Sequence, residues 1–271
     1  MSGNMQIAPD LRRRIIETAL NHGASVAGMA GRDALKASPS HRIYRRMGNY
    51  SGIGTVGGTG VLPHDQWFSW PDSARSVLVI ALAHPKEQPE LDWWDGRGTP
   101  GNRRMIETME RTRRQIETEL HIGAHALPYH IEKGGVFLKD AAVLAGLGCI
   151  GKNNMLLTPQ YGPRIRLRAL FLDVAVEPTG PSAFDPCIDC KVTCRTVCPE
   201  GALVRKAPVF SDWIATPNLP ARDGTYDRTR CNVRMEKDVA ASRASESGEP
   251  MPIRYCRQCE FVCPVGQKSM E

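Results

Sequence analysis

Cysteine is distributed very unevenly along this chain. Only Cys149 lies before residue 187, whereas the other eight of the nine cysteines fall within the last 85 of the 271 residues. Secreted disulfide-rich domains are small and carry a signal peptide, but this N-terminus has no apolar segment followed by a cleavage site. The basic run Arg12–Arg14 begins an amphipathic helical pattern rather than an export signal. We therefore expect a cytoplasmic protein whose clustered thiols are metal ligands.

Two closely spaced groups contain seven of these eight cysteines. They read Cys187-Ile-Asp-Cys190-Lys-Val-Thr-Cys194-Arg-Thr-Val-Cys198-Pro199 and Cys256-Arg-Gln-Cys259-Glu-Phe-Val-Cys263-Pro264, with Cys231 between them. Bacterial ferredoxins bind 4Fe-4S clusters with the run Cys-x2-Cys-x2-Cys-x3-Cys-Pro, and in two-cluster forms the cysteine before proline ligates the other cluster. Eight cysteines are the number that two such clusters require. The pattern predicts a bacterial-type ferredoxin module with two 4Fe-4S clusters.

The exchange of the fourth ligand between the two runs predicts which cysteines bind the same cluster. The first cysteine quartet is then Cys187, Cys190, Cys194 and Cys263, and the second cysteine quartet is Cys198, Cys231, Cys256 and Cys259. Three residues separate Cys190 from Cys194 where the usual run has two, so we expect a one-residue bulge in that loop. Zinc also accepts four cysteines, but the two Cys-Pro ends favour iron–sulfur. Clusters that only stabilise the fold are the structural alternative.

The segment 1–180 alternates helical and strand-like patterns, which predicts an α/β fold. We expect helices from Asp10, as N-cap, to Gly23, from 103 to 120 with Asn102 as N-cap, and from 136 to 147. Strands are predicted at 25–30, 76–83 and 168–176. Proline and glycine interrupt the pattern at 177–182, which places a domain boundary there and divides the chain into 1–180 and 181–271. Residues 240–252 are small and polar, and we expect a flexible excursion there.

A glycine-rich stretch at 48–60 contains Gly52-Ile-Gly54-Thr-Val-Gly57, the spacing of a dinucleotide-binding fingerprint. That fingerprint needs a strand before it and a helix after it, and neither pattern is present. We expect either a loop that approaches a large ligand or a surface loop.

Composition excludes several classes of protein. Hydrophobic residues make up 41% and charged residues 24%, as in globular proteins, and the longest apolar run, 77–83, is too short to cross a bilayer. We therefore expect no membrane association. The formal charge of +6 lies mostly in the segment 1–180, and it permits contact with an anionic cofactor or nucleic acid without requiring either.

The segment before the cysteines resembles a known family. It reads Glu132-Lys-Gly-Gly-Val-Phe-Leu-Lys-Asp-Ala-Ala-Val-Leu-Ala-Gly146-Leu-Gly148-Cys-Ile-Gly151-Lys152-Asn-Asn-Met-Leu-Leu157 and is followed by a strand and the cysteine runs. This order is similar to epoxyqueuosine reductases and, more distantly, to the core of reductive dehalogenases. The resemblance implies a nitroreductase-like corrinoid-binding domain, followed by the ferredoxin module. It also implies cobalamin, two 4Fe-4S clusters, and a low-potential donor such as ferredoxin or flavodoxin.

The resemblance also implies roles for single residues. The family's proton donor is an aspartate fourteen residues before the glycine that matches Gly146, and Glu132 occupies that position here, one methylene longer. Six further residues and one aromatic are the implied corrinoid contacts: Gly146, Gly148, Gly151, Lys152, Asn153, Asn154 and Tyr129. Helix capping explains Gly146 and Gly148 equally well, and Tyr129 and His130 also suit a core. Cys149 is expected to be a buried apolar filler or a neighbour of a cofactor.

Two departures from the family pattern bear on the substrate. Epoxyqueuosine reductases continue into a helical-repeat tail that contacts tRNA, whereas this sequence ends eight residues after Cys263, and the segment 96–105 replaces the family's Tyr-Ala-x-Gly-x-Asp-Tyr-His. We expect an oxidoreductase that acts on an epoxide, a carbon–oxygen bond or a carbon–halogen bond of a small organic substrate. The alternatives are an epoxyqueuosine reductase acting on tRNA without the tail, and a non-catalytic electron carrier that reduces a corrinoid protein.

Overall fold

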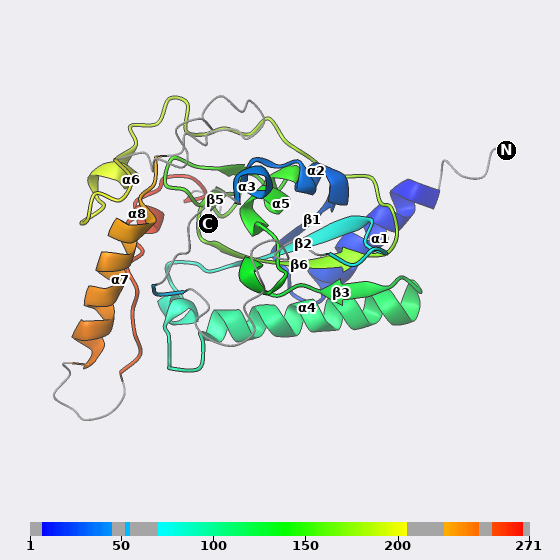
Figure 1. Ribbon diagram of the computed structural model, residues 1–271, viewed down its shortest axis with the longest axis horizontal. Coiled ribbons are helices and arrows are strands. Elements are labelled where there is room, and N and C mark those ends of the chain that lie inside the picture. Colours follow the sequence, from blue (N-terminus) through cyan, green and yellow to red (C-terminus); the bar gives the residue numbers. More distant parts are fainter. Residues whose placement is uncertain (1–6, 45–51, 55–69, 205–224, 244–250, 268–271) are drawn as a thin grey trace.

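A four-stranded antiparallel sheet forms the centre of the protein. The computed structural model describes residues 7–44, 52–54, 70–204, 225–243 and 251–267. The strands are β1 (Val26–Gly31), β2 (Ser76–Ala83), β3 (Ala124–Ala126) and β6 (Ile165–Leu172), in the order β1-β2-β6-β3 (Figure 1). A separate hairpin pairs β4 (Cys149–Ile150) with β5 (Leu156–Leu157). β2 and β6 pair along their whole length, so they form the rigid middle of the sheet.

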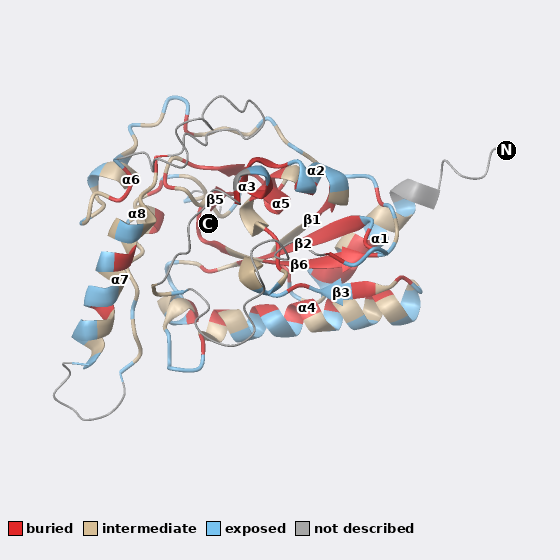
Figure 2. Cartoon of the chain, viewed as in Figure 1, coloured by how far each residue is buried: buried red, intermediate tan, exposed pale blue. Residues whose placement is uncertain are grey.

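Helices cover both faces of this sheet. On one face lie α1 (Ile7–Asn21) and α4 (Pro100–Glu119), and on the other lie α2 (Arg32–Lys36) and α5 (Leu138–Leu144). Alternate residues of β2 enter the two cores, Leu78 and Ile80 toward α4, Val77 and Val79 toward α5. A strand buried on both faces must be apolar throughout, which explains the run 76–83 (Figure 2). The expected mixed α/β fold is confirmed.

The remaining helices fall into two groups. The sheet domain also contains the short helix α3 (Pro39–Ile43) and the 3-10 turns η3 (Pro89–Asp92) and η4 (Ile131–Lys133). The cysteine-rich part contains α6 (Thr193–Thr196), α7 (Arg228–Arg243) and α8 (Gln258–Phe261), which lie together at one end of the sheet (Figure 1). α7 buries Asn232 and Asp238, and its other residues are half-buried or exposed (Figure 2). The described residues of this part therefore form little apolar core of their own.

The ends of four elements differ appreciably from the sequence predictions. α1 begins at Ile7, so Asp10 lies inside it and pairs with Arg13 rather than capping it. The side chain of Thr99, not Asn102, caps α4, and it accepts the Asn102 N–H at 3.1 Å. β6 runs from Ile165 to Leu172 instead of 168–176, because buried arginines in its first half interrupt the apolar pattern. α5 is also shorter than 136–147, ending before Gly146, which adopts φ +70°.

The predicted boundary at 177–182 is a well-packed crossing. The Thr179 hydroxyl donates to the Ala145 carbonyl at 2.6 Å, and the Thr179 N–H donates to the Met29 carbonyl at 3.0 Å. The segment that joins 1–180 to 181–271 is thus hydrogen-bonded to the end of α5 and to β1. The division of the chain into two domains at this point stays a proposal.

Two further sequence predictions fall partly on residues outside the described ranges. Of the glycine-rich stretch only 52–54 is described, and there the Ile53 N–H donates to the Asn232 side chain of α7 at 2.7 Å. α7 extends to Arg243, into the expected excursion, whose residues 244–250 lie outside the described ranges. In the described ranges, no helix has the length and apolar character needed to cross a bilayer.

Candidate metal centre

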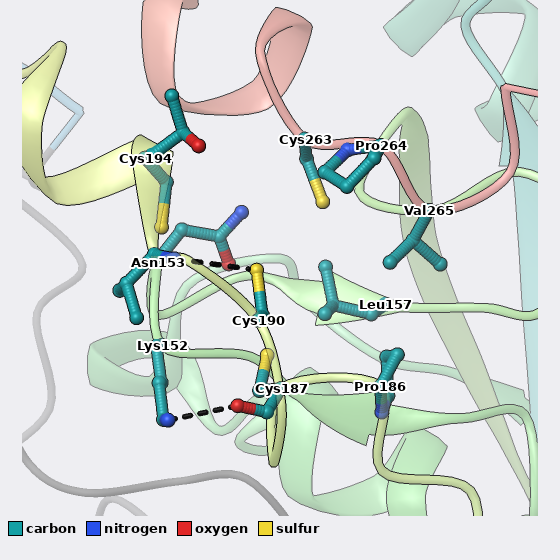
Figure 3. Close-up of a pocket in the computed structure, with 12 residues that line it drawn as sticks. Lys152, Asn153, Leu157, Pro186, Cys187, Cys190, Cys194, Cys263, Pro264 and Val265 are labelled. Atoms are coloured by element: carbon teal, nitrogen blue, oxygen red, sulfur yellow. Dashed lines mark hydrogen bonds between the residues drawn. The ribbon is translucent and has the colours of Figure 1, made fainter.

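The first cysteine quartet surrounds one hollow (Figure 3). Cys187 and Cys190 come from the loop before α6, Cys194 from α6, and Cys263 from the turn after α8. The hollow contains about 360 Å³ free of protein atoms, part of it open to solvent. Its other walls are the β4–β5 hairpin with Lys152, Asn153 and Leu157, and residues beside the cysteines. Two segments that are distant in the sequence thus bring four thiols to one place.

The second cysteine quartet is also grouped in space. Burial raises the pKa of the Cys259 thiol to about 12, and the thiols of Cys256, Cys231 and Cys198 act in the same direction. Cys231 is supplied by α7, Cys259 by α8, and Cys198 by the end of the first cysteine run. The eight thiols therefore separate into two sets with the membership that the ferredoxin rule gives.

Main-chain N–H groups point at two of the sulfurs. The Val192 N–H lies 3.4 Å from Cys190 Sγ, and the Ala202 N–H lies 3.3 Å from Cys198 Sγ. Hydrogen bonds to cluster sulfurs are one of the means by which proteins set cluster potentials. Val192 has φ +55°, which is a rare conformation for a β-branched residue, and it lies within the three-residue spacer between Cys190 and Cys194. The expected bulge is located here.

Positive groups border the first quartet. Lys152 Nζ donates to the Cys187 carbonyl at 2.8 Å (Figure 3), and Arg164, which is 3% exposed, donates to the Val265 carbonyl at 2.8 Å. Arg164 Nη1 is buried without a hydrogen-bond partner among the residues that the structure describes. Burial raises the pKa of Cys263, and the Arg164 guanidinium acts against that rise. Cations and an unpaired N–H suit a centre whose ligands are thiolates, since four thiolates give a 4Fe-4S cluster net negative charge.

The thiols of the first quartet line a hollow instead of converging on one point. In the ranges that the structure describes, no three His, Cys, Asp or Glu side chains are grouped closely enough to hold one metal ion. The four thiols instead stand around the hollow (Figure 3). All-cysteine ligands in this arrangement fit a 4Fe-4S cluster.

Cys149 lies directly beneath the first quartet. It is fully buried in β4 and packs with Leu157, Cys187 and Cys263. Burial raises the pKa of its thiol to about 12, which keeps it neutral. The position of Cys149 agrees with both interpretations from the sequence, because the residue fills a small apolar space and also neighbours the candidate centre.

Protein packing accounts for the three glycines that the resemblance assigns to a corrinoid. A Cβ on Gly146 would lie 2.7 Å from the Thr179 carbonyl oxygen, and one on Gly148 would lie 1.8 Å from the Leu157 carbonyl oxygen. A Cβ on Gly151 would lie 2.5 Å from the Leu157 side chain. These glycines allow the hairpin to fold tightly, so their role as corrinoid contacts gains no support from their surroundings.

The polar residues that follow them also have protein partners. Lys152 binds the Cys187 carbonyl, and Asn153 Nδ2 lies 3.4 Å from the Cys259 carbonyl oxygen. The Asn154 carbonyl accepts a hydrogen bond from Lys139 at 2.6 Å. Asn153 lines the first quartet and contacts the second, so this segment supports the cysteines. The corrinoid contacts predicted for these residues stay a prediction.

Glu132 and Tyr129 lie at a different place, beside β6. Glu132 is half-buried in η4, and the half-buried His130 before it has its pKa lowered by burial, with Glu132 acting in the opposite direction. The Tyr129 ring is 56% exposed and lies 4.3 Å from the Arg168 guanidinium carbon. The structure thus brings His130, Tyr129 and Arg168 together, with Glu132 near enough for its charge to act on His130.

Arg164 and Arg168 are site residues that sequence reasoning missed. The signal was present, because arginines alternate at 164, 166 and 168, just before and within an otherwise apolar strand. Charged residues are rarely buried unless they are paired or functional, so arginines at alternate positions of an apolar strand mark a polar site.

Comparison with known proteins finds two groups of relatives, and no family model matches. The chain is 39% identical over 132 residues to an epoxyqueuosine reductase of Listeria monocytogenes, covering 48% of this chain and 30% of that protein. It is 38% identical over 129 residues to a tetrachloroethene reductive dehalogenase of Desulfitobacterium hafniense, covering 45% and 21%. It spans 30% to 43% of the length of three epoxyqueuosine reductases that it matches.

Solved structures of both groups share the fold. A crystal structure of an epoxyqueuosine reductase aligns with a TM-score of 0.65 at 18% identity, over 97% of this chain and 67% of that one. A catabolic reductive dehalogenase in complex with 3-bromo-4-hydroxybenzoic acid aligns with a TM-score of 0.55 at 17% identity, over 93% and 31%. The chain is therefore a homologue of the epoxyqueuosine reductases and reductive dehalogenases, and it shares their fold.

Proposed function

We propose that this protein is an iron–sulfur oxidoreductase in which each cysteine quartet holds a 4Fe-4S cluster. The observation that carries the proposal is the closure of four thiols around one hollow, with Asn153 between this quartet and the second. Two adjacent clusters form a path for single electrons from a low-potential ferredoxin or flavodoxin into the protein. The relatives are named for reductions, which supports the same class of reaction here.

The relatives' names define the bond that is reduced. One group acts on epoxyqueuosine and the other on tetrachloroethene, so we propose a small organic substrate with an epoxide, a carbon–oxygen bond or a carbon–halogen bond. Breaking a carbon–halogen bond takes two electrons and one proton and releases halide. Opening an epoxide to an alkene takes two electrons and two protons and releases water. Both reactions need a proton donor at the substrate.

Glu132 is our proposed proton donor. It is half-buried beside the exposed Tyr129 and near Arg168, so it can reach solvent-borne substrate while remaining next to the sheet. We propose cobalamin as the further cofactor because a reductive dehalogenase of the same fold is described as carrying out B12-dependent dehalogenation.

Iron content tests the two clusters. Anaerobically purified protein should contain about eight irons per chain. Cys263→Ser should abolish the spectrum of the first cluster, because it removes one of four ligands. Cys149→Ser changes a thiol that packs against the same quartet, and it should keep the iron content of the unaltered protein. Equal iron content in the unaltered protein, Cys263→Ser and Cys149→Ser would contradict the assignment of Cys263 as a ligand. One zinc ion per quartet, in place of iron, would identify the quartets as zinc sites.

Turnover tests Glu132. Glu132→Gln keeps the size of the side chain and removes its proton, so turnover should fall at least 100-fold, the order expected for loss of a general acid. Iron content and cluster spectra should not change. Glu119→Gln, at the exposed end of α4, is the matched control and should retain full turnover. An active Glu132→Gln variant would remove this residue from the mechanism.

tRNA is a second candidate substrate. An epoxyqueuosine reductase structure with a modified tRNA stem loop aligns with a TM-score of 0.62 and covers 97% of this chain, which is the observation in its favour. Binding of such a stem loop should weaken steeply with salt if phosphates are contacted. No binding at low salt would leave the small organic substrate.

A further inference from the structure

Arg168 is a buried guanidinium that pairs with no carboxylate in the described part of the chain. It lies in the middle of β6 opposite Ile80 and is 7% exposed. Arg166, two residues earlier and on the same face of the strand, forms ion pairs with Asp92 at 2.9 Å and with Glu260 at 3.2 Å. Arg168 forms no ion pair with any described carboxylate. Arg166 and Arg168 thus occupy equivalent positions in one strand, but carboxylates neutralise only the charge of Arg166 among the described residues.

Neutral groups hold Arg168 in place. Its Nη2 donates to Asn102 Oδ1 at the start of α4, and its guanidinium stacks on the Tyr129 ring at 4.3 Å. The chain reaches Tyr129 along β6, since β3 pairs with Leu170–Leu172 and the Leu127 N–H then donates to the Ala169 carbonyl at 3.3 Å. An amide and an aromatic face orient a guanidinium without cancelling its charge.

This arrangement costs free energy unless an anion completes it. Burial lowers the pKa of Arg168, with only the Tyr129 hydroxyl acting in the opposite direction, but arginine stays protonated at neutral pH. An uncompensated buried charge is destabilising, and a guanidinium is the side chain best suited to bind a carboxylate or phosphate through two hydrogen bonds. The exposed Tyr129 places solvent next to this site.

The proposed proton donor is close by. The charges of both Glu132 and Arg168 act on His130, and the His130 ring packs edge-on against Tyr129 with 5.1 Å between centroids. A substrate held at Arg168 would therefore have Glu132 within the same small region.

We propose that Arg168, oriented by Asn102 and Tyr129, binds a carboxylate or phosphate group of the substrate that Glu132 protonates. The proposal rests on the proposed function, and it adds a class of substrate: an organic anion. Asn102 is then a positioning residue, and Arg168 makes the contact with substrate.

Calorimetric titration of the anaerobic holoprotein with benzoate and with inorganic phosphate tests the site. At least one of these anions should bind, more weakly at higher salt. Arg168→Met should weaken that binding at least tenfold. The affinity of Arg168→Lys should lie between those of Arg168→Met and the unaltered protein, because an ammonium keeps the charge but cannot form the two parallel hydrogen bonds of a guanidinium. Arg111→Met removes an exposed arginine of α4 and should bind as the unaltered protein does. No binding by the unaltered protein, or equal binding by Arg168→Met, would overturn the proposal.

Asn102→Asp tests the same site without removing the buried cation. The new carboxylate is an internal counter-ion for Arg168, so it should raise the unfolding temperature and weaken anion binding at least tenfold. This variant decides the question if Arg168→Met fails to fold. Tight anion binding by Asn102→Asp would overturn the proposal.

A cobalamin titration separates a substrate anion from the phosphodiester of a corrinoid. Cobalamin affinity that is the same in Arg168→Met and the unaltered protein supports a substrate anion, and a matching loss of both affinities would overturn that assignment. Iron content and cluster spectra of the same samples report on the proposed function separately from anion binding.

Discussion

Single buried residues decide how this protein responds to acid. His41 is 6% exposed, its ring packs edge-on against Trp70 and Phe137, and its Nδ1 lies 2.8 Å from the Ser38 hydroxyl. Burial lowers the pKa of His41 to about 4, although the nearby Asp140 carboxylate acts in the opposite direction. The folded protein therefore keeps this imidazole neutral.

Stability should consequently fall as pH drops below the ordinary histidine pKa of about 6.5. Between that value and about 4 the unfolded chain binds a proton that the folded protein does not, so acid favours unfolding. We expect a loss of about 2 kcal/mol between pH 7 and pH 5 from His41. Urea unfolding at both pH values measures it, and His41→Gln should show a smaller loss by that amount. Identical losses in the two proteins would show that His41 titrates normally in the fold.

At the scale of elements, a buried ionic network fastens α8 to the sheet. Glu260 of α8 is 2% exposed and pairs with Arg166 of β6 and with Arg257, which in turn lies 2.5 Å from Asp92 of η3. Burial opposes ionisation of Asp92, but His84, Arg166 and Arg257 together leave its pKa below the ordinary value. α8 has only four residues, so these contacts rather than helix propensity fix it in place.

Glu260→Gln should destabilise the protein by about 3 kcal/mol, because it leaves the buried Arg257 and the half-buried Arg166 to share the single carboxylate of Asp92. Hydrogen exchange should rise in residues 256–263 more than in β2 and β6. Glu107→Gln breaks the exposed pair with Arg111 and should cost less than about 1 kcal/mol. Thermal unfolding of both variants measures the difference, and equal effects would mean that the network does not fasten α8.

The sequence predicted elements where local pattern and tertiary environment agree. β2 has the predicted bounds because its residues from Val77 to Leu82 enter the two apolar cores in turn. β6 was misplaced because Arg164, Arg166 and Arg168 are stabilised by partners from distant segments, which hydropathy does not show. The grouping of thiols followed from motif spacing, whereas the packing of Gly146 against Thr179 depends on a contact between distant parts of the chain.

At the scale of the whole molecule, two parts differ in what holds them together. The sheet domain has two apolar cores that include Ile15, Met109 and Phe171, while the described cysteine-rich part relies on polar contacts and short helices. Under the proposed assignment, metal–thiolate bonds supply the missing stability, as in other small metal-binding modules.

Removing iron should therefore loosen one part and leave the other folded. After anaerobic chelation, amide exchange in 187–204 and 251–263 should increase greatly, whereas β2, β6 and α4 should stay protected. Hydrogen exchange with mass spectrometry measures both regions in one experiment. A cooperative loss of protection over the whole chain would show that the two parts fold as one unit.

The shared use of α8 has a consequence for how a cell completes this protein. Cys256 and Cys259 serve the second quartet and Cys263 serves the first, although only a short turn separates them. Under the proposed assignment, whichever cluster is inserted first fixes this turn and thereby presents the ligands of the other. Occupancy should then be all or none, so that a partly matured population consists of full and empty molecules, with few half-loaded ones.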